Sequence, residues 1–147
     1  MYIRLRIINA KYLITSSMSQ MINLPLLAVV VPCYNEEPVL QDTTTQLLSV
    51  LDGLIQSGRI SPDSTILYVD DGSGDRSWQM IEEYVNTREH VNGVKLAGNV
   101  GHQNALMAGL SVARDFADLM ISIDADLQDD IRVIPEMIDK YANDGCD

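Results

Sequence analysis

Residues 121–130 read ISIDADLQDD and place two aspartates, Asp124 and Asp126, directly after an alternating apolar stretch. Such alternation is typical of a β-strand, and a carboxylate is seldom buried there unless it is paired or binds a ligand. Residues two apart on an extended backbone point to the same side, so both carboxylates could reach one cation. Oxygen ligands suit Mg²⁺ or Mn²⁺, and Gln128 could add a neutral oxygen. The other two aspartates of the stretch are expected at the N-terminus of the next helix.

Three other segments that follow apolar runs are also polar: PCYNEE from Pro32, DDGS from Asp70 and AGNVGH from Ala97. Tyr34 offers a flat ring for a nucleobase, and Asp71 could accept hydrogen bonds from a base or ribose. Loops are usually polar, so one such segment means little, but four of them at one edge of a sheet suggest a site. Together with Asp124 and Asp126, they predict a pocket for a nucleotide diphosphate held by a metal ion.

The elements that must position these residues alternate between strand and helix. Short apolar runs predict strands over residues 26–31, 65–71, 94–96 and 119–124. Periodic apolar positions predict helices from Pro38 to about Gly58 and over residues 77–88, 101–115 and 131–141. This alternation predicts an α/β fold with a Rossmann-like parallel sheet flanked by helices. Ligands of such sheets bind beyond the carboxyl ends of the strands, where the polar segments fall.

The composition is that of one globular domain, with 147 residues, 46% hydrophobic and 21% charged. The formal net charge of −11 argues against nucleic acid or an anionic membrane surface as a direct partner. It does not exclude a phosphorylated ligand, because a bound divalent cation reverses the local field. Cys33 and Cys146 fit no zinc spacing and are expected to be reduced thiols of a cytosolic protein. The longest apolar run, residues 24–32, is too short to span a bilayer.

Residues 1–23 differ from the rest of the chain. They contain no acidic residue and only a short alternating stretch near their start. We expect an N-terminal extension that is poorly ordered over residues 1–23, followed by one domain over residues 24–147.

Each of these features also has a simpler interpretation. A lone Asp-x-Asp is common, DDGS is often a plain turn, and Tyr34 could be a packing residue. His102, which opens a predicted helix, is interpreted as a structural or surface residue rather than a catalyst. Phosphotransfer proteins also carry acid pairs after strands, but receiver domains need a Thr and a Lys at later strand ends. The aspartate-nucleophile phosphatases need Thr or Val two residues after the second Asp, where this chain has Gln128.

Four ordered segments, VVVPCYNEE, VDDGSGDRSW, GNVGHQNALMAGL and ISIDADLQDD, resemble the family 2 glycosyltransferases. The similarity is nearest to the polyprenyl-phosphate sugar transferases, which include dolichol-phosphate mannose synthase and bacterial undecaprenyl-phosphate glucosyltransferases. It covers roughly residues 24–147. The resemblance implies a GT-A fold, in which a Rossmann-like nucleotide-sugar half is followed by an acceptor half.

The resemblance also implies roles for individual residues. The nucleotide site would be lined by Pro32, Tyr34 and Glu36, with Val69 and Asp71 contacting the base or ribose. The diphosphate, the metal and the catalytic step would involve Asp124, Ala125, Asp126 and Gln128. The implied reaction transfers a sugar, with inversion, from a nucleotide-diphosphate sugar to a polyprenyl phosphate with the help of Mg²⁺ or Mn²⁺. The implied location is the cytoplasm or the cytoplasmic face of the membrane, and a homo-oligomer is left open.

Two departures from the family pattern matter. Gly98 stands where the family often has an arginine before its Asn-x-Gly step, so one basic residue for the diphosphate is missing. The chain also ends at Asp147, where the family continues into an acceptor half. We therefore expect a donor-binding half with an exposed sheet edge, marginal stability and no useful transfer on its own. The alternative function is a non-catalytic fragment that only binds the nucleotide sugar.

Overall fold

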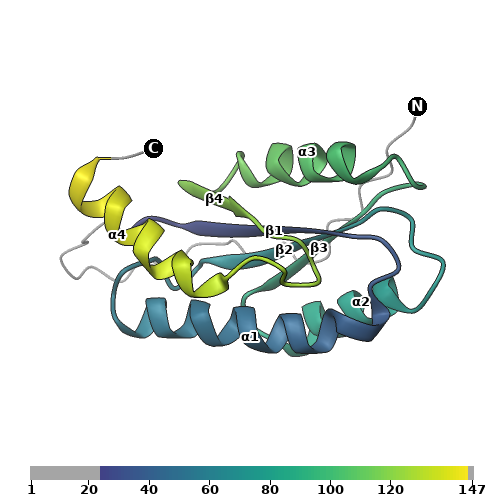
Figure 1. Cartoon of the computed structure of the whole chain (residues 1–147), viewed down its shortest axis with the longest axis horizontal. Coiled ribbons are helices and arrows are strands. Elements are labelled where there is room, and N and C mark those ends of the chain that lie inside the picture. Colours follow the sequence, from purple (N-terminus) through teal and green to yellow (C-terminus); the bar gives the residue numbers. More distant parts are fainter. Residues whose placement is uncertain (1–23, 146–147) are drawn as a thin grey trace.

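The structure, a computed structural model, describes residues 24–145, so the expectations for residues 1–23 and for Cys146 lie outside the described residues. Four parallel strands form one sheet in the order β3-β2-β1-β4. Helix α3 covers one face of this sheet, and α1, α2 and α4 lie on the other (Figure 1). The predicted α/β architecture with a parallel sheet is therefore confirmed.

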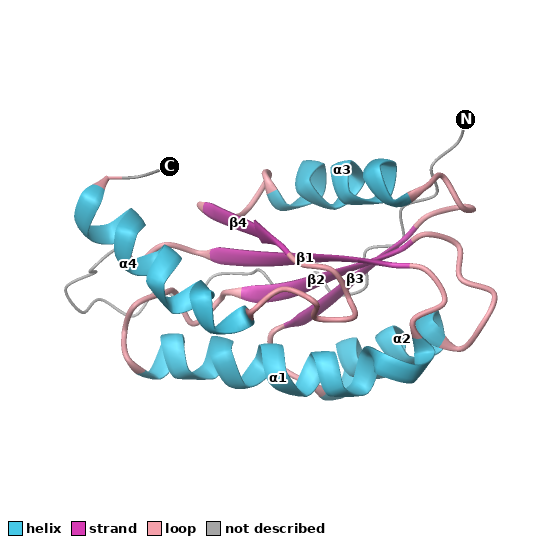
Figure 2. Cartoon of the chain, viewed as in Figure 1, coloured by secondary structure: helices cyan, strands magenta, loops and turns pink. Residues whose placement is uncertain are grey.

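Strands and helices alternate along the whole described chain (Figure 2). Their bounds are β1 Leu27–Cys33, α1 Glu37–Gln56, β2 Thr65–Asp70, α2 Ser77–Thr87, β3 Val91–Lys95, α3 His102–Ala113, β4 Leu119–Ser122, the 3₁₀ turn η1 Ile131–Val133 and α4 Ile134–Asp144. The elements agree with the predicted ones to within about two residues, with two exceptions. Strand β3 begins at Val91 rather than Val94, and the helix predicted from Ile131 begins at Ile134, after the turn η1.

The two central strands are buried on both faces, which is why their sequences are continuously apolar. Val29 and Val31 of β1 belong to the larger core cluster, which includes side chains of α1, α2 and α4. Val30 points the other way, into a smaller cluster beneath α3. A Cβ on Gly109 of α3 would lie 2.5 Å from Val30 Cγ1 and 2.6 Å from Val69 Cγ2. The missing side chain thus lets α3 approach the sheet closely.

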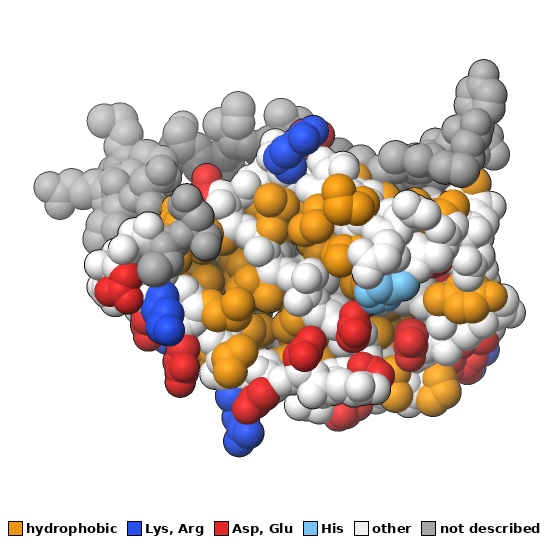
Figure 3. Space-filling model, turned by 45° about the horizontal axis from the view of Figure 1, so that its top comes forward, with side chains coloured by type: hydrophobic (Ala, Val, Ile, Leu, Met, Phe, Trp, Pro, Cys, Tyr) orange, Lys and Arg blue, Asp and Glu red, His pale blue; other side chains and the backbone are white. Residues whose placement is uncertain are grey.

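Strand β4 forms an open edge of the sheet, since within the described residues it pairs only with β1. Met120 of β4 is 41% exposed, and it contributes to an apolar groove of about 290 Å³ shared with Met137 and Tyr141 of α4. Figure 3 shows this face, where apolar side chains lie beside a band of acidic ones. Among the described residues, β4 therefore has one unpaired side. No helix within residues 24–145 is both long and apolar enough to cross a bilayer.

Candidate functional site

A pocket of about 160 Å³ lies at the carboxyl edge of the sheet, where ligands of parallel α/β folds bind. Its walls come from the segments that follow β1, β2 and β3 and from the start of α3. The lining residues are Pro32, Cys33, Tyr34, Glu36, Asp71, Asn99, Gly101, His102 and Ala105. The pocket thus brings together four of the six residues predicted to contact the nucleotide, from two separate segments of the sequence.

Asp71 holds the loop between β3 and α3 in place. Its side chain is 2% exposed, and its Oδ1 accepts the N–H of Val100 at 2.7 Å while Oδ2 accepts the N–H of Gly101 at 2.9 Å. The sequence suggested this carboxylate for a base or ribose, but in the structure both of its oxygens already accept backbone donors. Asp71 therefore fixes one wall of the pocket, a role that sequence reasoning missed because it depends on a distant loop.

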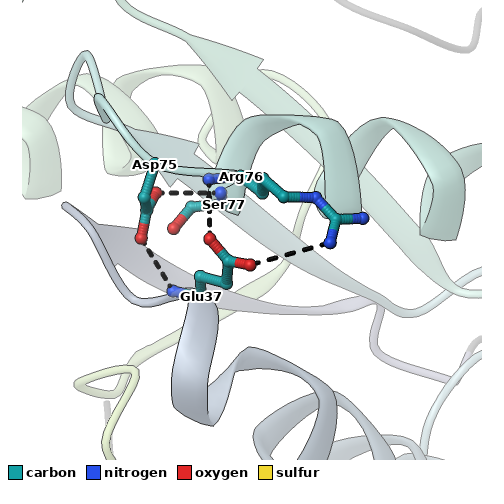
Figure 4. Close-up of polar contacts among 4 residues, drawn as sticks. All are labelled: Glu37, Asp75, Arg76 and Ser77. Carbon is teal, nitrogen blue, oxygen red and sulfur yellow. Dashed lines mark hydrogen bonds and ion pairs between the residues drawn. The ribbon is translucent and has the colours of Figure 1, made fainter.

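The starts of α1 and α2 cap each other beside the pocket (Figure 4). Asp75 Oδ2 accepts the N–H of Glu37 at 3.1 Å, and Glu37 Oε2 accepts the N–H of Arg76 at 3.0 Å. Asp75 Oδ1 also accepts the N–H of Ser77 at 2.9 Å, and Arg76 Nη1 lies 3.8 Å from Glu37 Oε1. Carboxylates at helix N-termini accept hydrogen bonds from the unpaired N–H groups of the first turn, and their negative charge interacts favourably with the helix dipole. The two loops therefore form one braced unit.

Asn35 turns the chain between Tyr34 and Glu36. Its φ of 57° lies in the left-handed region, which Asn tolerates better than most residues. Its Oδ1 accepts the N–H of Gly74 at 2.8 Å, and its own N–H donates to Ser73 Oγ at 3.0 Å. Tyr34, which precedes this turn, lines the pocket and is 48% exposed. The hydrogen bonds of Asn35 to the loop after β2 hold the backbone next to Tyr34 in place.

We predict that the Asp75 brace makes stability sensitive to acid. Desolvation raises the pKa of Asp75, but hydrogen bonds from Ser77 and from the N–H of Glu37 outweigh it, and the net pKa is lowered. A folded-state pKa below the unfolded value stabilises the fold above about pH 4, and this contribution is lost as the pH falls through the folded value. Asp75→Asn should therefore cost about 1 kcal/mol at neutral pH and flatten the loss of stability below about pH 4.

The measurement is urea unfolding followed by the fluorescence of Trp78, the only tryptophan of the chain, which is buried in α2. Asp52→Asn, at an exposed position of α1, is the control and should keep the pH profile of the unsubstituted chain. Identical acid profiles for Asp75→Asn and the unsubstituted chain would contradict the assigned role of Asp75.

The acids after β4 lie in an exposed loop at the same edge. Asp124 Oδ1 lies 3.5 Å from His102 Nε2, so its carboxylate faces the start of α3. Asp126 Oδ2 accepts the side-chain N–H of Gln128 at 2.6 Å, across a tight turn at Leu127, whose φ is 51°. Positive φ values are rare for bulky residues such as leucine, and residues in this strained conformation cluster at functional sites. Gln128 thus donates to Asp126 here, whereas the sequence suggested its oxygen as a metal ligand.

Glu36 connects the pocket to these acids. Partial burial raises the pKa of Glu36, and the negative charges of Asp126, Asp75 and Asp124 raise it further. The geometry agrees for Asp124, whose Oδ1 lies 3.5 Å from Nε2 of the pocket residue His102. Burial also raises the pKa of the Cys33 thiol, which keeps this pocket residue neutral rather than reactive.

Two of the six residues predicted to contact the nucleotide do not line the pocket, and neither do the diphosphate and metal candidates Asp124, Asp126 and Gln128. Val69 is buried in the core beneath α3, and Ala125 is buried while its C=O accepts a hydrogen bond from Thr43 Oγ1. Asn99 and His102 do line the pocket. The sequence placed their segment, AGNVGH, at this edge, but it gave Asn99 no role of its own and interpreted His102 as a structural or surface residue.

A larger hollow of about 420 Å³ lies at the other end of the sheet. It is lined by residues 62–65 and 85–92, which surround the starts of β2 and β3. His90 is part of its wall, and its Nδ1 lies 3.0 Å from the C=O of Ser64. Because the strand ends with their acidic side chains lie at the opposite edge, size alone does not make this hollow the functional site.

The donor set after β4 fits a divalent cation that arrives with its ligand. Within residues 24–145 no cluster of three or more His, Cys, Asp or Glu side chains is arranged to hold a metal by itself. Mg²⁺ commonly takes only one or two carboxylates and completes its coordination with water and substrate phosphates. The exposed carboxylates of Asp124 and Asp126, beside a pocket, match that pattern.

The chain is similar in sequence to known glycosyltransferases. The model of the glycosyl transferase family 2 matches residues 28–147. The chain is 54% identical over 123 residues to the uncharacterized glycosyltransferase YkoT of Bacillus subtilis (strain 168), covering 84% of this chain and 36% of that protein. It is 35% identical over 126 residues to the undecaprenyl-phosphate 4-deoxy-4-formamido-L-arabinose transferase of Shewanella sediminis (strain HAW-EB3), covering 85% of this chain and 35% of that protein.

Among solved structures, the crystal structure of S. aureus TarS 1–349 in complex with UDP superposes with a TM-score of 0.54 at 21% identity. The match covers 80% of this chain and 33% of that one. The fold is thus that of the GT-A glycosyltransferases. Because the family model matches most of its length, the chain belongs to glycosyl transferase family 2. It spans about a third of the length of the curated relatives that it matches.

Proposed function

We propose that the chain forms the donor-binding part of a glycosyltransferase that uses a nucleotide-diphosphate sugar and a polyprenyl phosphate. The observation that carries this proposal is the pocket at the carboxyl edge with the Asp124 and Asp126 carboxylates beside it. Membership of the family supports sugar transfer as the reaction. The UDP in the TarS crystal structure supports a nucleoside diphosphate as the leaving group.

In the proposed complex the nucleoside half of the donor occupies the pocket. The exposed ring of Tyr34 stacks on the base, and Pro32 and Glu36 line the adjacent wall. Asp71 acts chiefly through the loop that it holds, and a base or ribose would meet a wall that is already ordered. Preorganised contacts of this kind lower the cost of ordering on binding.

The carboxylates of Asp124 and Asp126 would hold Mg²⁺ or Mn²⁺ next to the diphosphate, with the side chain of Gln128 orienting Asp126. When bound, the cation stabilises the negative charge that develops on the departing diphosphate. These two side chains are the ones that we assign to catalysis. Asp126 is already oriented by its contact with Gln128, whereas Asp124 faces His102.

In the proposed reaction the bond between the anomeric carbon and the diphosphate breaks, and its electron pair leaves with the nucleoside diphosphate. An oxygen of the lipid phosphate forms the new bond from the opposite face of the sugar, which inverts the anomeric centre. That phosphate is already largely ionised near neutral pH, with a second pKa of about 6, so it needs positioning more than a strong base. The printed name of the Shewanella relative supports a polyprenyl phosphate as acceptor. A lipid acceptor would set the reaction at a membrane surface, and we propose its cytoplasmic face.

We predict that UDP binds to the purified chain in the presence of Mn²⁺ and that Asp126→Asn weakens this binding about tenfold or more. The reason is that the substitution removes one of the two carboxylates proposed to hold the cation. Isothermal titration calorimetry measures the effect, and Asp129→Asn, an exposed acid of the same segment, is the matched control. Equal affinities in the Asp126→Asn variant and the control would place the metal elsewhere.

Transfer is tested separately from donor binding, since the chain spans about a third of the length of its relatives. A radiolabelled-sugar assay with lipid phosphate in detergent compares the chain with a full-length relative. Donor binding without transfer supports the alternative function of a nucleotide-sugar-binding unit. Turnover equal to that of the full-length protein would establish that these residues suffice for the reaction.

A further inference from the structure

His102 lies between the pocket and the acidic loop. It is the first residue of α3, it lines the pocket, and its side chain is 51% exposed. Its Nε2 lies 3.5 Å from Asp124 Oδ1, which belongs to the proposed metal site. If a nucleoside fills the pocket and a cation sits at Asp124, the diphosphate that joins them must pass the imidazole ring.

The pocket offers few groups that could bind a diphosphate. Its lining contains no Lys or Arg, and two of its side chains, Glu36 and Asp71, are carboxylates. Gly98, in the adjoining loop, supplies no side chain. Asn99 already uses its Oδ1 to accept the N–H of Gly101 at 3.1 Å, which commits that side chain partly to the loop. Figure 3 likewise shows acidic side chains gathered around a histidine, with Lys and Arg side chains farther out.

We propose that His102 donates a hydrogen bond from its imidazole to the diphosphate of the sugar donor. This inference rests on the proposed function and assigns to His102 a role that its sequence position alone did not suggest. In the structure the same ring faces the carboxylate of Asp124. Hydrogen bonds to charged acceptors are stronger than neutral ones, so one well-placed donor has a measurable effect in a pocket without Lys or Arg.

The packing of α3 fixes the position from which His102 would contact the diphosphate. The helix lies close against β1 and β2 at Gly109, and the loop before it is held by the carboxylate of Asp71. The backbone of His102 therefore has little freedom to move.

The test compares His102→Ala, His102→Gln and the control Gln103→Ala in the intact chain. Gln103 is the next residue of α3, is exposed and does not line the pocket. Calorimetric titrations use three probes: UDP with Mn²⁺, inorganic pyrophosphate with Mn²⁺, and uridine alone. Pyrophosphate is included because its binding does not depend on the base that the pocket prefers.

His102→Ala should weaken UDP and pyrophosphate binding roughly tenfold or more and leave uridine binding unchanged. His102→Gln keeps an N–H donor and should recover most of the lost affinity, whereas Gln103→Ala should change nothing. Equal losses for uridine and UDP, or no loss at all, would overturn the role of His102 while leaving the proposed function intact. If the unsubstituted chain binds neither UDP nor pyrophosphate, the proposed function is overturned together with this inference.

Discussion

Gly72→Ala is expected to destabilise the chain by about 2–5 kcal/mol, the largest effect that we expect from a single methyl group. Gly72 has a φ of 73°, a conformation that costs a residue with a side chain about 1–2 kcal/mol. A Cβ at this position would also lie 2.7 Å from the N of Asn99 and 2.7 Å from the carbonyl carbon of Gly98. Both atoms are backbone, so no side-chain rotation can relieve the contact.

The methyl group would push away the loop that the neighbouring Asp71 holds, so UDP binding should weaken along with stability. Urea unfolding, followed by Trp78 fluorescence, measures the first effect and calorimetry the second. Gly74→Ala is the matched control, because a Cβ there meets only Asn35 Oδ1, at 3.9 Å, and the φ of Gly74 is not positive. We expect that control to stay within about 1 kcal/mol of the unsubstituted chain. Equal unfolding midpoints for the two variants would rule out the close approach at Gly72.

Sequence patterns predict a strand best when the strand's own residues determine its structure. The apolar runs of β1 and β2 are buried on both faces, and their sequences already require this. The sequence pattern did not predict the first three residues of β3, which include Asn92-Gly93, a pair that is typical of turns. In the structure Gly93 is a buried strand residue, and a Cβ there would lie 2.7 Å from Ile81 Cγ2 of α2. Close packing of α2 therefore overrides the local preference.

The same distinction applies to the site. The edge at which Tyr34, Glu36 and Asp71 meet follows from the parallel topology, so the sequence could predict their proximity. The partners of Asp71 and of Glu37 lie in loops that are distant in sequence and are brought close only by the folded sheet. The contact between Gln128 and Asp126 depends on the positive φ of Leu127, which no pattern in the sequence predicts.

Asp71→Ala is expected to cost about 2–4 kcal/mol of stability and to weaken UDP binding at least tenfold. The substitution removes a buried carboxylate that accepts two backbone N–H groups, those of Val100 and Gly101. Hydrogen bonds to a charged group contribute about 1.5–3 kcal/mol each, and part of this loss is recovered where water reaches the freed N–H groups. Asp71→Asn keeps the shape but offers only one acceptor oxygen, so its effect should be intermediate.

This pair of measurements separates two roles that Asp71 could have. A carboxylate that only contacts the base or ribose would lower UDP affinity when removed and leave the free energy of unfolding unchanged. If the carboxylate holds the loop, its removal should lower both the UDP affinity and the free energy of unfolding. The intact carboxylate should also protect the amides of Val100 and Gly101 from hydrogen exchange. We expect that protection in the unsubstituted chain and its loss in Asp71→Ala, while the amides within β1 stay protected. Unchanged exchange at Val100 and Gly101 would show that the loop holds its position without Asp71, and would favour a direct contact with the nucleotide.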